Sequence, residues 1–338
     1  MSVKGYPMLQ FKELKRLLPI HKEKLLALEK FCRAKDGTTA SVCNSTEFNC
    51  RRDIPVFFLV FKNMSVQENS RAEVLFQKIP LSKMELIGYL SVFLPEEGTA
   101  ELNVLIHPDY RRQGIFTELL QRAKAALSAI GTKEFVFVCE PSSSDATAAM
   151  FAIKAEKRSS EYQMFLESSA HISSSFRNMT PAINSPETSK GKRKQILCNT
   201  PGELLEATPD DLPLLGRMNA LFFETSEEMG ELFAEDSYYT PGITVYKYVI
   251  IEKNKKTVPI GTICFCEEAH SGNIFGLGIL PEYRGLGYGK DLLNALLARI
   301  PTDKIIYLQV SSRNAAAFQL YQKTGFQIIA QQDFWLLP

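Results

Sequence analysis

Apolar positions along the chain follow two periods, one typical of strands and one typical of helices. Short apolar or alternating runs predict strands at residues 56–62, 86–94, 100–106, 134–139, 161–166, 204–207, 245–252, 260–265, 274–280 and 305–310. Helical spacing predicts helices at residues 11–33 with a break at Pro19, around Leu119 to Leu127, after Thr208, and at 146–155, 290–299 and 315–323. A final hairpin is predicted from 326–329 and 334–337. This mixture indicates the α/β class.

The second half of this pattern repeats the first. Residues 106–120 match residues 279–293 after a shift of 173 positions, and seven of the fifteen pairs are identical. A repeat of about half the chain length is typical of tandem domains, because solenoid repeats are much shorter. We expect a first domain at 1–167, a linker or surface excursion at 168–201 and a second domain at 202–338. Each domain is expected to be a mixed, mostly antiparallel sheet flanked by helices (α+β).

The composition narrows the class of protein. The 338 residues are 45% hydrophobic and 23% charged, which is ordinary for a soluble globular protein. A formal net charge of +1 gives no support to a nucleic-acid partner. The longest apolar run, 54–61, is strand-sized, so no membrane span is predicted, and the N-terminal stretch lacks the apolar core of a signal peptide. The basic cluster at 190–194 is either a solvated surface or a site for an anionic partner.

Seven cysteines are scattered along the chain, at Cys32, Cys43, Cys50, Cys139, Cys198, Cys264 and Cys266. An odd set without a C-x-x-C pair is typical of reduced thiols in a cytoplasmic protein. The four histidines are isolated, so Cys264 and Cys266 lack partners for zinc and no metal site is expected. We interpret the cysteines as buried or inert.

The repeated loop in the second half carries candidate chemistry. Gly285, Gly287 and Gly289 occupy alternate positions directly before a helix. Such glycines leave backbone N–H groups unshielded, and the helix N-terminus adds partial positive charge. Arg284 and Lys290 can add full charges beside them. The loop is therefore a candidate cradle for a pyrophosphate group.

Two stretches in sequence order carry a family resemblance. Arg284-x-x-Gly287-x-Gly289 is followed, one strand later, by the run Asn314-Ala-Ala-Ala-Phe-Gln-Leu-Tyr321. With them, residues 202–338 resemble the GNAT superfamily of acetyl-CoA-dependent acyltransferases, in a tandem layout similar to that of mycothiol synthase. The resemblance implies acetyl-CoA (coenzyme A) as cofactor, bound by Ile279, Leu280, Arg284, Gly285, Leu286, Gly287, Tyr288, Gly289, Lys290, Asn314 and Tyr321.

Tyr321 is the candidate general acid. It follows Asn314 by seven residues, which is about two helical turns on the same face. The resemblance implies that a tyrosine at this place protonates the departing CoA thiolate, and a phenol can donate to such a group. The alternative is a packed tyrosine whose hydroxyl bonds a neighbour. Asn314 also suits the N-cap of its helix, and both roles are compatible.

The general base is left open by the sequence. Glu267 and Glu268 follow the strand at 260–266 and are either candidate bases or surface charges. Family members that acetylate protein N-termini often carry Glu where this chain has Gln309, which cannot accept a proton. A water chain is the alternative route. Backbone N–H groups near Gly278 to Leu280 are expected to polarise the acetyl carbonyl.

The first half departs from the family pattern. Phe116 stands where the loop motif has a small residue, and matching the spacing puts Phe151, or one residue along Ala152, opposite Tyr321. Neither offers an acid, so we expect this half to keep the fold and to have lost transfer chemistry. A second cofactor site remains possible there, at Arg111, Arg112, Gln113, Gly114 and Ile115.

These observations predict an N-acetyltransferase that moves an acetyl group to a primary amine by direct attack in a ternary complex in the second domain. No covalent nucleophile is expected, because Cys264 and Cys266 lack a base. The alternative is a non-catalytic CoA-binding regulatory or scaffold protein. The acceptor is a peptide or small-molecule amine, and a variable loop at 222–239 is expected to help form its pocket. Neither a membrane nor a nucleic acid is an expected partner.

Overall fold

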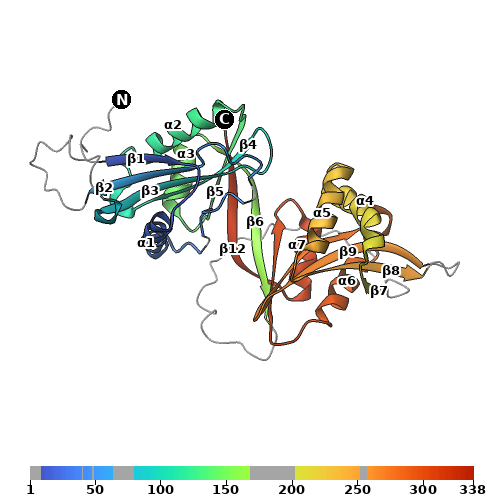
Figure 1. Cartoon of the computed structure of the whole chain (residues 1–338). Helices are drawn as coiled ribbons and strands as arrows, with labels where there is room; N and C mark the ends of the chain where they lie inside the picture. Colours follow the sequence, from blue (N-terminus) through green and yellow to red (C-terminus); the bar gives the residue numbers. More distant parts are fainter. Residues whose placement is uncertain (1–8, 40, 48, 64–79, 168–201, 252–256) are drawn as a thin grey trace, which may run out of the picture. The chain divides into compact units, whose positions relative to one another are not determined.

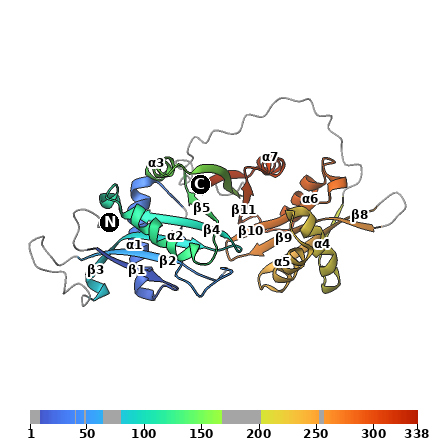
Figure 2. The same ribbon diagram turned by 90° about the horizontal axis from the view of Figure 1, so that it is seen from above.

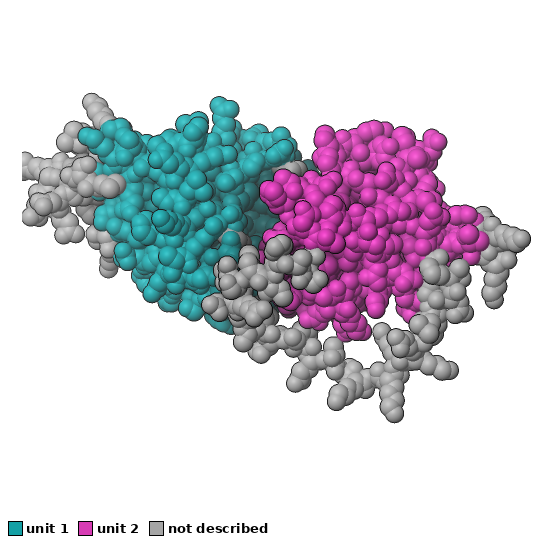
Figure 3. Space-filling view, turned by 90° about the horizontal axis from the view of Figure 1, so that it is seen from below, with its two compact units in different colours: residues 1–160, 330–338 teal, residues 161–329 magenta. Residues whose placement is uncertain are grey.

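A computed structural model describes residues 9–39, 41–47, 49–63, 80–167, 202–251 and 257–338. The chain divides into two compact units, which Figure 3 colours separately. Unit 1 contains residues 1–160 and 330–338, and unit 2 contains residues 161–329. Each unit combines strands and helices, which confirms the predicted mixed class and the tandem organisation (Figure 1).

Unit 1 is a mostly antiparallel set of strands covered by helices. Its elements are β1 (Leu9–Leu14), α1 (Pro19–Asp36), β2 (Phe57–Asn63), β3 (Met84–Phe93), β4 (Thr99–Ile106), α2 (Ile115–Ser128), β5 (Glu134–Cys139), α3 (Ser144–Ala152) and the start of β6 (Glu156–Leu166). The strands follow the order β1-β2-β3-β4-β5, and only β4 and β5 run parallel. Helices α1 and α2 lie on opposite faces of these strands, and α2 lies over β2, β3 and β4 (Figures 1 and 2).

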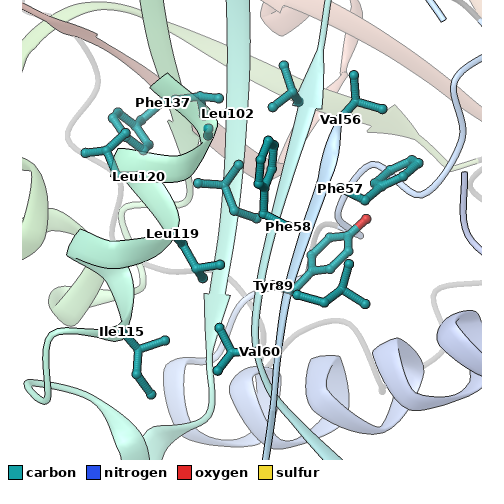
Figure 4. Close-up of a cluster of buried hydrophobic side chains, with 14 of the residues drawn as sticks. Val56, Phe57, Phe58, Val60, Tyr89, Leu102, Ile115, Leu119, Leu120 and Phe137 are labelled. Atoms are coloured by element: carbon teal, nitrogen blue, oxygen red, sulfur yellow. The ribbon is translucent and has the colours of Figure 1, made fainter. Parts of the chain in front are cut away.

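The core of unit 1 lies between α2 and the strands. Ile115, Leu119 and Leu120 point from α2 toward Val60, Phe58 and their neighbours on the strands (Figure 4). The helical spacing of these apolar residues gives α2 one buried face. Burying side chains of this size contributes roughly 1.5–3 kcal/mol each. This packing fixes the N-terminus of α2 against the end of β4.

Unit 2 repeats this arrangement with one additional helix. Its elements are β7 (Glu203–Glu206), α4 (Leu212–Phe223), α5 (Glu227–Tyr239), β8 (Ile243–Ile251), β9 (Thr257–Glu267), β10 (Ser271–Ile279), α6 (Tyr288–Leu297), β11 (Ile305–Ser311), α7 (Ala315–Thr324) and the start of β12 (Gln327–Leu337). The strand order is β7-β8-β9-β10-β11, with β10 and β11 parallel. Helices α4 and α5 cover one face and α6 covers the other (Figure 1).

The division of the chain differs from the predicted domain boundaries at two strands. Residues 161–166 of β6 pair with β11 and belong to unit 2, whereas residues 333–337 of β12 pair with β5 and belong to unit 1. The predicted hairpin of 326–329 and 334–337 is therefore wrong, because Gln327–Leu337 form one continuous strand. Spacing alone does not reveal which partner a strand finds, because pairing depends on residues far away in the sequence. The predicted linker at 168–201 lies outside the described residues.

Two further element predictions need correction. Residues 11–14, predicted as helix, belong to β1, whose alternating Leu9 and Phe11 pack on the unit 1 core. The predicted variable loop at 222–239 is largely helix α5, which begins after the N-cap Ser226. The Ser226 hydroxyl accepts a hydrogen bond from the Met229 amide, as a helix start requires.

Parallel strands separate in both units at the same place. In unit 1, β4 and β5 pair from Thr99/Glu134 to Leu102/Phe137, where their pairing ends. In unit 2, β10 and β11 pair from Ser271/Ile305 to Ile274/Leu308. The separated strand ends leave a wedge in each unit, at the end where the glycine-containing loop begins.

Candidate active site

The loop of unit 2 has the backbone shape of an anion cradle. Gly285 and Gly287 have φ of 79° and 96°, a left-handed conformation that disfavours other residues. Gly287 is the N-cap of α6, so the first amides of this helix have no intrahelical acceptor. Successive amides in a left-handed turn at a helix N-terminus bind anions. The residues present therefore fit the pyrophosphate of acetyl-CoA.

Arg284 fixes this loop to its strand. Its Nε donates to the Ile279 carbonyl oxygen at 2.8 Å. Among the described residues, no carboxylate lies within ion-pair distance of Arg284. Gly289 faces the wedge, because a Cβ added there would lie 3.6 Å from Leu320 Cδ2 and 3.9 Å from Ile279 Cγ1. A larger side chain at residue 289 would therefore extend into the space between α6 and α7.

Strand β10 carries a β-bulge where it leaves β11. Phe275 pairs with Cys264 and Gly278 with Thr262, so β10 has one extra residue between these pairs. Gly276 within the bulge has φ of 64°. Its carbonyl oxygen accepts a hydrogen bond from Thr262 Oγ1 at 3.0 Å. The bulge thus has a defined conformation held from the neighbouring strand β9.

Two aromatic side chains of α4 and α5 cover the bulge. A Cβ added to Gly278 would lie 2.0 Å from Phe222 Cδ2, so only glycine fits there. A Cβ on Gly276 would lie 3.5 Å from the Phe233 ring. The residues proposed for an acceptor loop therefore reach the wedge, but from helices instead of a loop.

The predicted oxyanion donors near Gly278 to Leu280 need a partial correction. The Leu280 amide donates to the Ile260 carbonyl oxygen at 2.8 Å. Gly278 and Ile279 lie in the regular ladder with β9, opposite Thr262 and Gly261. The irregular backbone lies instead one step earlier, at Gly276 and Leu277.

Helix α7 places Asn314 and Tyr321 on the other side of the wedge. Asn314 is the N-cap, and its Oδ1 accepts from the Ala317 amide at 3.0 Å. Tyr321 is only 7% exposed and packs against Phe326, with ring centroids 5.9 Å apart. Burial raises the pKa of Tyr321 to about 12. Within the described parts of the chain its hydroxyl has no hydrogen-bond partner.

Glu267 and Glu268 lie at the opposite end of β10 from the loop. Glu267 pairs with Gly272 at the start of β10 and forms an ion pair with Lys304 at 2.8 Å. Glu268 accepts from Ser271 Oγ at 2.6 Å in the adjoining turn. About seven residues of strand separate them from Ile279, which is roughly 23 Å of extended chain. The structure does not bring these two carboxylates to Tyr321, because the strand direction carries them away.

The buried thiol of Cys264 in unit 2 is not activated. Burial raises the pKa of the Cys264 thiol to about 12, while the Ser237 hydroxyl acts in the opposite direction. Within the residues described, no group of three or more His, Cys, Asp and Glu side chains could hold a metal ion. No helix in the described ranges is both long and apolar enough to cross a bilayer.

Unit 1 keeps the backbone shape of the loop with different side chains. Gly114 has φ of 83° and is the N-cap of α2, as Gly287 is for α6. Arg112 has φ of 62° where unit 2 has Gly285, a conformation that costs about 1 kcal/mol or more for a residue with a Cβ. Phe116 turns into the wedge, and its ring lies 5.8 Å from that of Phe137. Phe116 therefore narrows the wedge of unit 1 at the position where unit 2 has Gly289, and both rings line the cavity that is left there.

The loop arginines of unit 1 are neutralised by carboxylates. Arg111 Nη2 lies 2.7 Å from Asp36 Oδ2, and Arg111 Nη1 lies 2.8 Å from Asp145 Oδ2. Arg112 also approaches Asp145, at 3.6 Å. Hydrogen bonds from Arg111 lower the pKa of Asp145. A cavity of about 450 Å³ lies in the wedge of unit 1 and is lined by the loop, by the ends of β4 and β5 and by α3. Arg111, Arg112 and Asp145 lie on its lining and are already paired with one another.

Unit 1 also lacks the bulge and the tyrosine. Strand β4 pairs with β3 in unbroken register from Glu101 to Ile106. The helix caps give the correspondence of the following helix: Ser143 caps α3 as Asn314 caps α7, and Lys154 (φ 59°) ends it as Gly325 (φ 101°) ends α7. Met150, which is 4% exposed, therefore corresponds to Tyr321. The sequence predicted Phe151 or Ala152 as this counterpart, so the prediction was wrong by one or two positions.

The model of the acetyltransferase (GNAT) family matches this chain twice, at residues 55–152 and 217–326. The chain belongs to the GNAT acetyltransferase family. The two matches fall one in each half, which agrees with the tandem organisation. This membership makes the protein an acetyltransferase of a family that generally uses acetyl-CoA.

Individual relatives differ in what they acetylate. The chain is 33% identical over 135 residues to N-alpha-acetyltransferase 50 of Danio rerio, covering 38% of this chain and 75% of that protein. It is 43% identical over 56 residues to spermine/spermidine N(1)-acetyltransferase of Bacillus subtilis (strain 168), covering 16% and 37%. Among solved structures, a tandem GNAT protein from the clavulanic acid biosynthesis pathway matches with a TM-score of 0.56 and 16% identity, covering 97% and 98%.

Sequence reasoning missed the bulge and its partner Thr262. The signal was present: Gly276 and Gly278 interrupt a strand that is otherwise apolar, and glycine within a strand often marks a bulge or a close approach. Thr262 itself gave no signal, because a threonine in a strand is ordinary.

Proposed function

We propose that unit 2 transfers the acetyl group of acetyl-CoA to a primary amine by direct attack, with Tyr321 as the general acid. One observation carries this proposal: Tyr321 is buried beside the wedge of unit 2 with a hydroxyl that bonds no described residue. The ring is buried, but the hydroxyl oxygen is not among the fully buried polar atoms of the described residues that lack a partner, so solvent or a ligand can reach it. An accessible hydroxyl on a fixed ring suits proton donation. Unit 1 has Met150 at this place and can make no such donation.

Acetyl-CoA would be held by the loop of unit 2. The amides from Gly285 to Gly289 and the N-terminus of α6 suit its pyrophosphate, since both present positive potential. The pantetheine arm would follow the wedge between β10 and α7, past Gly289. Ile279 and Leu280 would line this path, and Asn314 would continue to cap α7.

The bulge would polarise the acetyl carbonyl. The trans peptide between Gly276 and Leu277 places the carbonyl oxygen and the N–H on opposite sides. Since the Gly276 oxygen accepts from Thr262 on β9, the Leu277 N–H is directed away from β9, toward the separated β11. A fixed amide at this place stabilises negative charge on the carbonyl oxygen during attack.

The transfer balances without a covalent enzyme intermediate. A neutral amine attacks the thioester carbon, the C–N bond forms and the C–S bond breaks. The departing sulfur receives the proton of the Tyr321 hydroxyl, and the new amide nitrogen loses its extra proton to water. The tyrosinate is then reprotonated from solvent. Glu267 and Glu268 take no part in this scheme because they lie at the far end of β10.

The test is a transfer assay with the whole chain. We expect the protein and acetyl-CoA to acetylate at least one member of a panel of free-amine peptides and polyamines, detected by free CoA thiol and by product mass. Omitting the amine gives the background. The alternative function, a non-catalytic CoA-binding protein, predicts binding of acetyl-CoA without transfer to any member of the panel, including at pH values where the amines are neutral.

A further inference from the structure

We propose that Thr262 is a positioning residue of the transfer reaction, which acts through the bulge of β10. The inference rests on the proposed function of unit 2 and adds a residue to it. Thr262 is 2% exposed and lies on β9, next to β10. Its hydroxyl instead donates to the Gly276 carbonyl oxygen at 3.0 Å.

This hydrogen bond matters because the peptide in the bulge has an alternative orientation. The peptide between residues 276 and 277 can rotate as a unit, and a glycine at its start has wide freedom to do so. Rotation would turn the Leu277 N–H from the wedge toward the sheet. The Thr262 hydroxyl holds the carbonyl end of this peptide, so it keeps the N–H end in place. A hydrogen bond of this kind can favour one orientation of such a peptide by up to about tenfold.

The comparison of the two units supports this assignment. Tyr89 corresponds to Thr262 in unit 1, since Gly88 pairs with Ile106 as Gly261 pairs with Ile279. The Tyr89 hydroxyl donates to the Cys43 carbonyl oxygen and not to β4. Unit 1 therefore lacks both the bulge and the hydroxyl that would hold it. The two features occur together only in the unit that carries the buried tyrosine.

The first variant is Thr262→Val, which keeps the shape of the side chain and removes the hydroxyl. We expect kcat to fall about tenfold or more, because loss of an oxyanion donor costs about 10²–10³ and this variant only loosens one. The KM for acetyl-CoA should change by less than about twofold, because the substitution leaves the pyrophosphate loop unaltered. Thr262→Ser, which keeps the hydroxyl, should recover most of the rate.

A second readout needs no acceptor. Infrared difference spectra of acetyl-CoA labelled with ¹³C at the carbonyl report the hydrogen bond to that oxygen. We expect the bound carbonyl band of the unaltered protein to lie below that of free acetyl-CoA, and the band in Thr262→Val to return toward the free position. An unshifted band in the unaltered protein, or the same band in both proteins, overturns the proposal.

Deletion of Gly276 is a variant with a predictable register. With this residue absent, Phe275, Leu277 and Gly278 would face Cys264, Ile263 and Thr262 in an unbroken ladder, as in β4 of unit 1. We expect it to fold, to bind acetyl-CoA and to lose the carbonyl shift. If the unaltered protein transfers no acetyl group but shows the shift, the proposed function fails, and what stands is that Thr262 holds the amide that binds the carbonyl of acetyl-CoA. Full activity with unchanged spectra in both variants overturns the role of Thr262 alone.

Discussion

Met150 in unit 1 stands where Tyr321 stands in unit 2. Each follows the N-cap of its helix by seven residues, and each is buried against its own core, at 4% and 7% exposure. Only the tyrosine carries a proton to donate. The replacement removes the acid while keeping a side chain that fills the same space.

We predict that Tyr321→Phe lowers kcat by about 10²-fold and leaves the KM for acetyl-CoA nearly unchanged. Phenylalanine keeps the packing against Phe326 and lacks the hydroxyl, and general acid catalysis contributes about 10²–10⁴. Steady-state kinetics at saturating amine provide the measurement, with Tyr307→Phe on β11 as the control. Turnover equal to that of the unaltered protein would remove the acid role.

The pH dependence should show no loss of the tyrosine proton in the neutral range. The pKa of Tyr321 is raised to about 12, above its ordinary value near 10, so the protonated form prevails throughout the range in which amines become neutral. Activity should therefore rise with pH and level off at the amine pKa, with no decline below about pH 10. A bell-shaped profile that keeps its alkaline limb in Tyr321→Phe assigns that limb to another group.

The same shift has a consequence for stability. A raised pKa in the folded state contributes stability that is fully present below pH 10 and is lost as the pH rises through 12. A rapid spectrophotometric titration should show one phenol of the unaltered protein ionising near pH 12. The titration of Tyr321→Phe should lack that ionisation step.

Much of the site followed from local pattern. The glycine loop, the Asn314 cap and the order of strands were predictable because each depends on neighbouring residues. Glu267 and Glu268 could not be placed, since their distance from the loop depends on how far β10 extends between them. The partners of β6 and β12 depend on pairings between residues about 140 or more positions apart, as in Leu166 with Ile306 and Val138 with Phe334, and no local pattern encodes them.

The matched loop glycines give a test of cofactor binding. Gly287 and Gly114 are both N-caps with left-handed φ, so a glutamate introduces similar strain and charge in each. We expect one acetyl-CoA site in calorimetry, abolished by Gly287→Glu and retained in Gly114→Glu. The loop of unit 1 is neutralised by Asp36 and Asp145, and the Phe116 ring narrows its wedge. Two sites in the unaltered protein, with one surviving in Gly287→Glu, would show that unit 1 also binds.

The ion pair of Arg111 should stabilise unit 1. Both Arg111 and Asp36 are largely buried, with side chains 15% and 12% exposed, so Asp36→Ala leaves a guanidinium only partly paired. We expect a loss of about 2–3 kcal/mol. The single tryptophan, Trp335, lies in the unit 1 core, and its fluorescence during urea unfolding gives the measurement. Asp53→Ala, which breaks an exposed pair with Arg51, should leave the midpoint unchanged.

The exchange of strands between the sequence halves sets the order in which the protein is completed during synthesis. Residues 333–337 supply the neighbour of β5, and the buried Asp333 accepts hydrogen bonds from Lys157 and Ser160. A ribosome will have made unit 2 almost entirely before these residues appear. Until then the nascent chain carries β5 as an open edge, the kind of surface that invites aggregation. The half that is translated first is therefore the half that finishes folding last.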